Sequence, residues 1–203
     1  MKKGKLVVLE GGEGAGKDTQ MDLLQGVLDP NEYLFVRDPG STVIGVAIRD
    51  IVLREEKLTP TAELLMYLAS RVQMTSEILR PALEKGMNVI SNRYDLSTIA
   101  YQVSGRVCPE ALAPLKVMSE YILKDITTDL LIYLDCLPEI GIQRKKDEGI
   151  TLDRFETEPL DFHQRVYDGY KEHLNEYNHV VIDGHQSKED VHVEVMKALQ
   201  TVI

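Results

Sequence analysis

The chain has 203 residues, and its 33 acidic side chains outnumber its 23 basic ones, giving a formal net charge of −10. Hydrophobic residues make up 43% and charged residues 28%, a balance typical of one folded domain rather than of a disordered chain. The negative total argues against a protein that binds nucleic acid or anionic membranes over its surface, because such surfaces need an excess of Lys and Arg. A small anionic ligand is not excluded, since net charge does not say where the positive groups lie.

Cysteine content and hydropathy indicate where the protein works. Cys108 and Cys136 are too few for a disulfide framework and lack metal-ligand spacing, so we expect two reduced thiols, with Cys136 in a buried strand. The basic start of the chain leads into an apolar run at 6–9 that ends at Glu10, which is too short for an export signal. No apolar stretch approaches the ~18 residues that a membrane-spanning helix needs. These features predict a cytoplasmic protein.

Short apolar runs alternate with longer helical patterns along the chain. The runs are rich in Val, Ile, Leu and Tyr, as expected of strands that are buried on both faces. This alternation predicts a parallel sheet with helices on both faces. The predicted strands are 6–9, 33–36, 88–90, 130–134 and 179–182. The predicted helices are 21–28, 61–83, 109–123, 138–146, 159–177 and 188–202, three of them starting at a proline, with Pro81 near the end of the second.

The pattern contains no repeat, low-complexity tract or linker, so we predict one domain spanning residues 1–203. The segment at about 145–156 is polar, mixed in charge and contains Gly149. It is the best candidate for a mobile flap.

A glycine-rich segment at 11–19 lies between the first predicted strand and the first predicted helix. That context indicates a P-loop, in which backbone N–H groups and the helix start bind phosphate oxygens. Lys17 is expected to neutralise the β- and γ-phosphates of a nucleotide, and a purely structural glycine turn is the alternative. The residues expected to bind this nucleotide are Gly11, Gly12, Glu13, Gly14, Ala15, Gly16, Lys17, Asp18 and Thr19.

Asp18 departs from the P-loop pattern, which places Ser or Thr after the lysine to bind Mg²⁺. A carboxylate facing phosphates repels them unless a cation lies between. Asp18 is therefore a magnesium ligand or an outer partner of the ion, or it points away and Thr19 supplies the hydroxyl, or it only complements the dipole of the helix. The sequence leaves these alternatives open.

Motifs beyond the P-loop narrow the reaction. The chain lacks Asn-Lys-x-Asp, which argues against a GTPase; it reads Arg-Asp-Pro-Gly-Ser-Thr at 37–42, Ala-Glu-Leu-Leu at 62–65, Asn-Arg-Tyr at 92–94, Ala-Tyr-Gln at 100–102, Tyr-Leu-Asp at 133–135 and Asp-Arg-Phe-Glu at 153–156. In order and spacing, these motifs resemble bacterial-type thymidylate kinases nearly end to end. The resemblance implies a P-loop nucleoside monophosphate kinase of three-layer α/β/α fold, with a five-stranded parallel sheet. It also implies transfer of phosphate from ATP to dTMP with Mg²⁺, giving dTDP, and usually a homodimer.

Such a reaction joins two polyanions, and the acceptor phosphate, with a second pKa near ~6, is already nucleophilic at neutral pH. It needs no general base, but it needs positive charge that holds donor and acceptor in line. Arg37, Arg49 and Arg93 each follow a predicted strand or lie on the next helix, at the carboxyl edge where ligands bind in such folds. By resemblance they hold the dTMP phosphate, while Arg144 and Arg154 close over ATP. The predicted catalytic residues are Lys17, Arg93 and Arg154, together with Asp18, which departs from the family pattern.

Residues four apart suggest how the acceptor base is recognised. Tyr67 and Arg71 share one helix face. By resemblance, Tyr67 stacks on thymine, where the family usually has Phe, and Arg71 bonds to the base; simple core packing is the alternative for Tyr67. Thr98 and Gln102, again four apart, are expected to line the same pocket. The resemblance places Tyr101 against the sugar, where it disfavours a ribose hydroxyl, and has Glu13 meet the acceptor's sugar or the metal.

Asn92 is a second departure, because the family has an aspartate there that helps to organise Mg²⁺. This chain pairs a P-loop carboxylate, Asp18, with a strand-end amide, so the two positions supply one carboxylate in both arrangements. We hypothesise that Asp18, with Asn92, has taken over the metal-organising task, directly or through water. Independent drift at the two positions is the alternative.

Two other functions remain open on the sequence. One is a kinase for another deoxynucleoside monophosphate, with Tyr67 in place of Phe and Ser70 beside Arg71 as the features that would shift the preference. The other is a nucleotide-binding homologue that has lost catalysis through Asp18 and Asn92. The expected partners are ATP, dTMP and a second copy of the chain, with no nucleic acid and no membrane.

Overall fold

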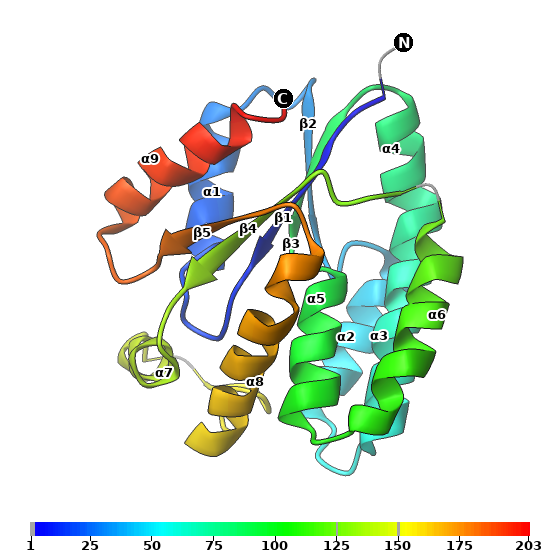
Figure 1. Ribbon diagram of the computed structural model, residues 1–203, viewed down its shortest axis with the longest axis vertical. Helices are drawn as coiled ribbons and strands as arrows, with labels where there is room; N and C mark the ends of the chain where they lie inside the picture. The colour runs from blue at the N-terminus through cyan, green and yellow to red at the C-terminus, as the bar shows by residue number, and fades with distance from the viewer. Residues whose placement is uncertain (1–2, 125, 150) are drawn as a thin grey trace.

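The computed structural model describes residues 3–124, 126–149 and 151–203 (Figure 1). Its centre is a parallel five-stranded sheet in the order β2-β3-β1-β4-β5. In register, Val8 of the central strand lies between Ser91 and Leu131. All five predicted strands are present, and each runs one or two residues farther at its carboxyl end. They are β1 (Leu6–Glu10), β2 (Tyr33–Arg37), β3 (Asn88–Asn92), β4 (Leu130–Asp135) and β5 (His179–Asp183).

Helices cover both faces of this sheet. Four of them adjoin other helical turns. π-Helical Thr75–Leu79 follows α3 and π-helical Ile99–Gly105 follows α5, while a short 3₁₀ turn at Pro109–Ala111 precedes α6 and another at Leu174–Glu176 follows α8. The α-helices are α1 (Lys17–Val27), α2 (Val43–Arg54), α3 (Pro60–Met74), α4 (Arg80–Glu84), α5 (Asp95–Thr98), α6 (Leu112–Leu123), α7 (Pro138–Asp147), α8 (Leu160–His173) and α9 (Lys188–Leu199).

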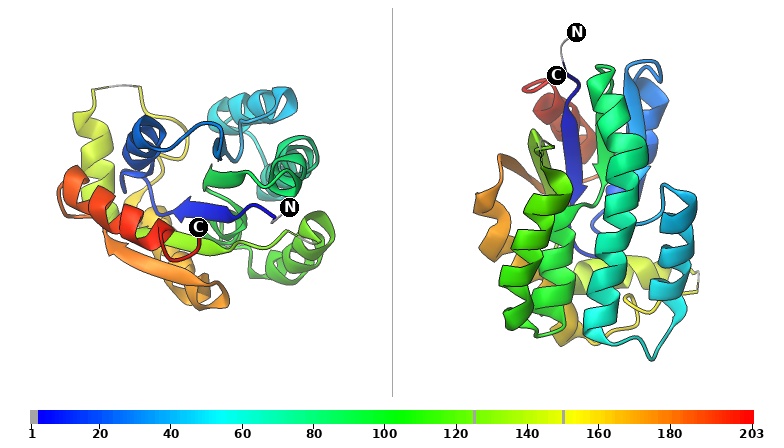
Figure 2. Two further views of the ribbon diagram at one scale, coloured as in Figure 1. Left: turned by 90° about the horizontal axis from the view of Figure 1, so that it is seen from above. Right: turned by 90° about the vertical axis from the view of Figure 1, so that its right-hand side faces the viewer.

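The strands are apolar on both faces because each face is covered. Successive side chains of a strand point to opposite sides. Val7 and Leu9 pack with residues of α1 and α9, whereas Leu6 and Val8 pack with residues of α3 and α4. On the latter side, Tyr133 of β4 joins a cluster with α6 and α8. Figure 2 shows the strands between these two helical layers, so the predicted three-layer α/β/α fold is confirmed.

Two helical segments were absent from the predicted ranges. The first is α2, which is capped by the Thr42 hydroxyl accepting from the N–H of Gly45 at 2.9 Å. It packs chiefly on α3 and leaves much of its apolar surface exposed, so its sequence lacks a clear two-sided pattern. The second is 95–105, which changes from α- to π-helical bonding part-way and is almost wholly buried. A change of helical period removes the repeat of 3.6 residues on which the prediction relies.

Several predicted boundaries shift. The first helix begins at Lys17 rather than Met21, because the P-loop leads directly into it. The helix predicted over 61–83 passes through Pro81 to Glu84, with the π-helical turn just before the proline. Pro159 caps α8 instead of starting it, and α9 ends at Leu199.

The two thiols are free, and Cys136 is buried just beyond the end of β4 rather than within the strand. Over the part of the chain that the structure describes, no helix combines the length and the apolar character needed to cross a membrane.

Candidate active site

A cavity of about 490 Å³ lies at the carboxyl edge of the sheet, where β1, β2 and β3 end. Its walls come from the P-loop, α3, the 95–105 helix, α7 and the loop that follows β5. Of the predicted site residues, Gly11, Gly12 and Arg154 do not line it. Those that do are Glu13, Gly14, Ala15, Gly16, Lys17, Asp18, Thr19, Arg37, Arg49, Tyr67, Arg71, Asn92, Arg93, Thr98, Tyr101, Gln102 and Arg144.

The P-loop packs closely against α7. Gly14 has a φ of 66°, and a Cβ there would lie 2.0 Å from the carbonyl oxygen of Gly141, so both positions need the absence of a side chain. The sequence analysis missed Gly141, because a glycine inside a helical pattern carries no local signal for such an approach. This contact holds the loop in shape beneath the cavity.

Lys17 folds back over the loop. Its Nζ donates to the carbonyl oxygens of Gly11 at 2.9 Å and Gly12 at 2.6 Å. Burial, reinforced by the nearby Arg93 guanidinium, lowers the pKa of Lys17 to about 7. An anion bound in the loop would raise the pKa of Lys17 again, because its negative charge stabilises the ammonium.

Arg93 lies at the centre of the site, directly after β3, with a left-handed φ of 69°. Its Nη1 donates to Gly11 O and Tyr170 Oη, each at 3.0 Å, and its Nη2 donates to Glu13 Oε1 at 2.7 Å and Tyr101 Oη at 2.9 Å. Although burial alone would lower the pKa of Arg93, the Tyr101 and Glu13 side chains raise it. A permanent positive charge is therefore held at the junction of β1 and β3.

Glu13 stays ionised although it is largely buried. Tyr101 Oη donates to its Oε1 at 2.7 Å. Burial would raise the pKa of Glu13, but the Arg93 guanidinium, the Lys17 ammonium and this hydrogen bond together lower it to about 2. The carboxylate thus orients both Arg93 and Tyr101.

Glu10 anchors the turn that presents Arg93, and the sequence analysis missed this role. The buried carboxyl accepts from the N–H of Tyr94 at 2.9 Å, from Ser97 Oγ at 2.5 Å and from Tyr170 Oη at 3.0 Å. An acidic residue that ends an apolar strand is the only signal in the sequence, and by itself it predicts only the end of the apolar run.

Three polar side chains meet where the P-loop approaches β2 and β3. Arg37 Nη2 and Asn92 Nδ2 both donate to Oδ1 of Asp18, the amide at 2.6 Å. Burial would raise the pKa of Asp18, but the Arg37 guanidinium, Lys17 and the Asn92 hydrogen bond lower it. Asp18 and Asn92, which the sequence singles out as departures from one pattern, are thus in direct contact.

Arg49 brings further positive charge to this end of the cavity. Its Nη1 donates to Pro39 O at 3.3 Å. Burial, together with repulsion from Arg37 and Arg93, lowers the pKa of the Arg49 guanidinium. The guanidinium groups of Arg37, Arg49 and Arg93 therefore line the same part of the cavity. Such a cluster suits a doubly charged phosphate.

At the other end, Arg71 is buried with only 1% of its side chain exposed. Its Nε donates to Asp38 Oδ2 at 2.6 Å, and its Nη2 donates to Tyr94 O at 2.9 Å and Thr98 Oγ1 at 2.8 Å. Arg71 Nη1 and Asp38 Oδ1 have no hydrogen-bond partner among the described residues. Arg71 and Asp38 both line the cavity, and each keeps one unpaired polar atom, a donor and an acceptor. Because such buried groups are rarely left unpaired, this end of the cavity suits the edge of a heterocyclic base.

Tyr67 and Gln102 complete this end. The Tyr67 ring meets the Phe155 ring edge to face, with centroids 6.4 Å apart, and both line the cavity. Gln102 Nε2 donates to Glu63 Oε1 at 3.0 Å, so its amide oxygen remains available to the cavity. The structure brings all four predicted base-pocket side chains to one wall.

Arg154 is the predicted charged residue that does not line the cavity. Its guanidinium donates to Val52 O at 3.0 Å and forms an ion pair with the fully buried Glu63, which also pairs with Arg106 at 3.1 Å. In this arrangement Arg154 does not reach the cavity, because Glu63 offers it a desolvated carboxylate. No local sequence pattern predicts this competitor, because Glu63 and Arg154 are 91 residues apart.

The predicted flap at 145–156 is partly helical, since α7 runs to Asp147. Its other end is a turn, in which Asp153 Oδ1 accepts from the N–H groups of Phe155 at 2.8 Å and Glu156 at 2.9 Å. Lys145 Nζ reaches Glu156 Oε1 at 3.2 Å and joins the two ends. Residue 150, within the predicted flap, lies outside the described residues.

Arg144 lies beside the P-loop, where its Nη1 donates to Gly184 O at 2.9 Å and Gly14 O at 3.3 Å. The loop after β5 and the start of α9 form this wall, with residues that belong to no motif in the sequence. They are Gly184 and Gln186 in the loop, and Lys188 and Val191 on α9.

A family model described as thymidylate kinase matches residues 9–195. The chain belongs to the thymidylate kinase family. A thymidylate kinase of Pseudoalteromonas translucida (strain TAC 125) is 40% identical over 205 residues, which cover 98% of this chain and 97% of the relative. One of Carboxydothermus hydrogenoformans is 37% identical, covering 98% of both chains, and one of Colwellia psychrerythraea is 38% identical, covering 98% and 95%.

Family membership confirms the resemblance seen in the motifs. It makes the chain a nucleoside monophosphate kinase, a phosphotransferase whose family acts on dTMP with ATP as phosphate donor. The P-loop and the buried Arg71 line the same cavity.

Proposed function

We propose that this chain phosphorylates dTMP to dTDP by direct in-line transfer from ATP, with the ATP phosphates in the P-loop and the thymine against Arg71. The observation that carries the proposal is the continuity of the cavity. A phosphate-binding loop with Lys17 and a buried pair, Arg71 and Asp38, with free hydrogen-bonding atoms line the same space. With ATP at the P-loop end and dTMP at the Arg71 end, the phosphate groups of the two nucleotides face each other inside the cavity.

Catalysis in this scheme depends mainly on positively charged side chains that bind and neutralise the phosphates. Lys17 neutralises the β- and γ-phosphates of the donor, and Arg93 contacts the transferring group. Arg37 and Arg49 hold the acceptor phosphate, which is nucleophilic without a general base. Arg93 suits its role because Glu13 and Tyr101 already fix its guanidinium, so little reorganisation is needed.

Recognition of the base rests on the free atoms at the buried end. Arg71 Nη1 donates to a carbonyl oxygen of thymine, and Tyr67 stacks on the ring. Thr98, Gln102 and Asp38 supply further polar contacts along the base edge. Tyr101 limits space beside the sugar, which favours a deoxyribose.

Mg²⁺ fits this donor set. The ion prefers hard oxygen ligands and is usually held by one or two carboxylates together with substrate phosphates. Asp18 supplies such a carboxylate at the cavity wall, and only its Oδ1 accepts hydrogen bonds from Arg37 and Asn92 among the contacts described. Asp18 and, directly or through water, Asn92 would hold the ion. It would offset phosphate charge.

Arg144 and Arg154 complete the donor end. Arg144 lies between the P-loop and the loop after β5, which suits contact with the donor's adenosine part. Arg154 closes over the donor phosphates after leaving Glu63 as the flap moves.

An assay of ADP release with a panel of nucleoside monophosphates tests the proposal. We expect turnover with dTMP and Mg²⁺, little with dCMP, dAMP or dGMP, none when EDTA removes the metal, and a loss of at least a thousandfold in Lys17→Met. Preference for another deoxynucleoside monophosphate would overturn the assignment of the acceptor. Absence of ADP with every acceptor would indicate a catalytically impaired homologue.

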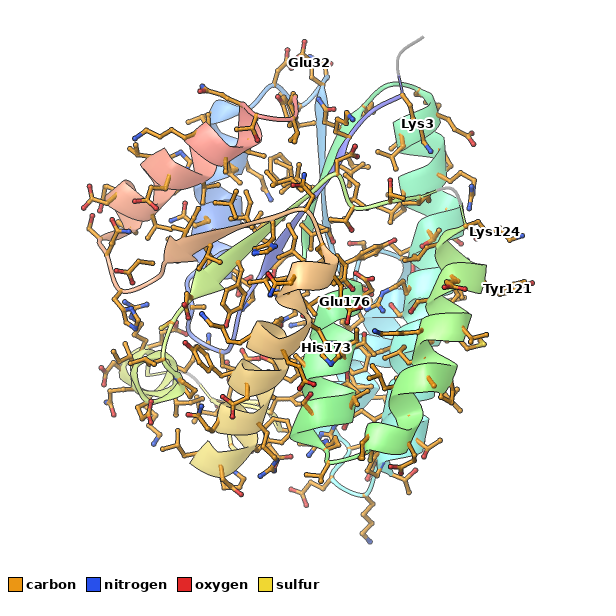
Figure 3. The ribbon with its side chains drawn as sticks, in the orientation of Figure 1. Lys3, Glu32, Tyr121, Lys124, His173 and Glu176 are labelled. Carbon is orange, nitrogen blue, oxygen red and sulfur yellow. The ribbon has the colours of Figure 1, made fainter. Side chains whose placement is uncertain are left out.

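We also propose one domain that works as a cytoplasmic homodimer without nucleic-acid or membrane partners. Apolar side chains are exposed on α2, where Val43 is 89% exposed, and on α6, where Tyr121 is 69% exposed. Figure 3 shows Tyr121 and Lys124 projecting from α6 away from the sheet. Light scattering coupled to size-exclusion chromatography tests the dimer: a mass of one chain at micromolar concentration would contradict it.

A further inference from the structure

The contact between Asp18 and Arg37 joins two subsites that the proposed function keeps apart. Asp18 lies in the first turn of α1 at the donor end, whereas Arg37 ends β2 at the acceptor end. Their side chains form an ion pair at the cavity wall, 61% exposed for Asp18 and 40% for Arg37. No other side-chain hydrogen bond or ion pair of Arg37 is found among the described residues. The acceptor-binding arginine is thus occupied by a donor-side carboxylate.

We propose that Asp18 couples donor and acceptor binding: it holds Arg37 while the donor end is empty, and it releases Arg37 to the acceptor phosphate when the metal-bound donor arrives. This inference rests on the proposed function, because it takes Arg37 as a ligand of the acceptor phosphate. It adds that Arg37 is unavailable to the acceptor phosphate until the donor is bound.

The reason lies in competition for one carboxylate. A divalent cation beside Asp18 attracts the same negative charge that holds Arg37, and it repels the guanidinium. An exposed ion pair is weak, with a typical coupling of about 1 kcal/mol or less, so a bound cation can displace it. Donor binding that frees Arg37 must strengthen the binding of the acceptor. By linkage, acceptor binding then strengthens donor binding by the same factor.

Asn92 keeps the carboxylate in the position from which it can switch. Its buried amide donates to Asp18 Oδ1 at 2.6 Å, and the same oxygen accepts from Arg37. A carboxylate at position 92 would repel Asp18, whereas the neutral amide holds it between the two subsites. An aspartate at position 18 therefore goes together with an amide, and not with a second carboxylate, at position 92.

Calorimetric titration of dTMP, with no metal and no donor, tests the first half. We expect Asp18→Asn to bind dTMP roughly fivefold more tightly than the unaltered protein. The matched control is Asp22→Asn, which removes the same charge one turn farther along α1, at an exposed position that does not line the cavity. We expect no change in dTMP affinity there, and equal tightening in both variants would overturn the proposal.

A double-mutant cycle separates release of Arg37 from simple charge repulsion. In an Arg37→Met background, Asp18→Asn should no longer tighten dTMP binding, because there is no guanidinium to release. If the tightening persists, Asp18 acts on the phosphate directly and the proposal is wrong. Asp18→Thr provides a second variant should the amide form a new hydrogen bond with Arg37.

The second half is tested by repeating the titrations with Mg²⁺ and a non-hydrolysable ATP analogue. We expect the analogue to strengthen dTMP binding in the unaltered protein and to lose this effect in Asp18→Asn. Equal coupling in both proteins would contradict the proposal. If the unaltered protein binds no dTMP at all, the proposed function fails; if it binds dTMP and Asp18→Asn behaves identically, only this inference fails.

Discussion

The two ends of the cavity hold their arginines in opposite ways. Arg71, at the base end, is 1% exposed and donates to the Asp38 carboxylate, a backbone carbonyl and the Thr98 hydroxyl. Arg37, at the phosphate end, is 40% exposed, and its guanidinium is paired with Asp18 alone among the described residues. One guanidinium is fixed by its surroundings, whereas the other is free to exchange partners.

This difference follows from solvation. Breaking a buried ion pair by removing one partner leaves an uncompensated charge, while an exposed pair is replaced by water at little cost. The base end is therefore organised before a ligand arrives and suits selection between bases. The phosphate end can rearrange as charges enter, which suits a site where two polyanions must be brought together.

Arg71→Met should have the largest effect on stability, because it leaves the Asp38 carboxylate buried without a partner. We expect a loss of about 3–5 kcal/mol in the free energy of unfolding and no measurable dTMP binding. Urea denaturation and calorimetric titration measure the two. Adding Asp38→Asn should recover much of the stability but not the binding. A loss below about 1 kcal/mol would show that the base end is no more fixed than the phosphate end.

Glu13→Gln tests whether the centre of the site behaves like the buried end. The pKa of Glu13 is lowered from 4.5 to about 2, so ionised Glu13 contributes up to about 3 kcal/mol. That contribution is fully present above pH 4.5 and is lost as pH falls toward 2. In urea denaturation, the difference between the two proteins should be greatest at pH 7 and should shrink below pH 4.5. A difference independent of pH would indicate that the Arg93 pair is not its cause.

Arg154→Met should lie between the two extremes. The arginine is mostly buried against Glu63, but Arg106 and Gln102 still satisfy that carboxylate after its removal. We expect a loss of about 1.5–3 kcal/mol in the free energy of unfolding. We also expect kcat to fall more than the affinity for dTMP, because Arg154 must leave Glu63 to reach the donor. An unchanged kcat would show that it stays at Glu63 throughout, and Arg54→Met, on α2 with 81% of its side chain exposed and outside the cavity lining, serves as the control for charge loss.

Arg37→Met should have the smallest effect on stability, less than about 1 kcal/mol, because its ion pair with Asp18 is exposed. Its affinity for dTMP should nevertheless fall by roughly tenfold or more, since a bidentate phosphate contact is lost. Thermal unfolding and calorimetric titration check this split. A large loss of stability without a change in dTMP affinity would contradict the view that Arg37 is free to exchange partners while Arg71 is fixed.

Much of this protein can be predicted from local sequence. Apolar runs bounded by polar residues predict the five strands because a strand buried on both faces needs apolar side chains at every position. The P-loop is predicted by glycine and lysine spacing, which depends on neighbouring residues only. Arg37 and Arg93 follow predicted strands, and the carboxyl ends of parallel strands meet at one edge. The acidic total charge of −10 hides this basic site, because it sums the cavity with the rest of the surface.

Only the tertiary structure decided which charges pair. Glu63 takes Arg154 away from the cavity, and Glu10 anchors the turn before Ser97, through contacts 91 and 87 residues apart in sequence. Such pairings depend on the packing of helices on the sheet and on the cost of leaving a buried charge unpaired, neither of which a local pattern contains. Sequence alone thus determined the sheet, the P-loop and the edge at which the ligands meet. Packing determined which arginine is fixed and which is free to move.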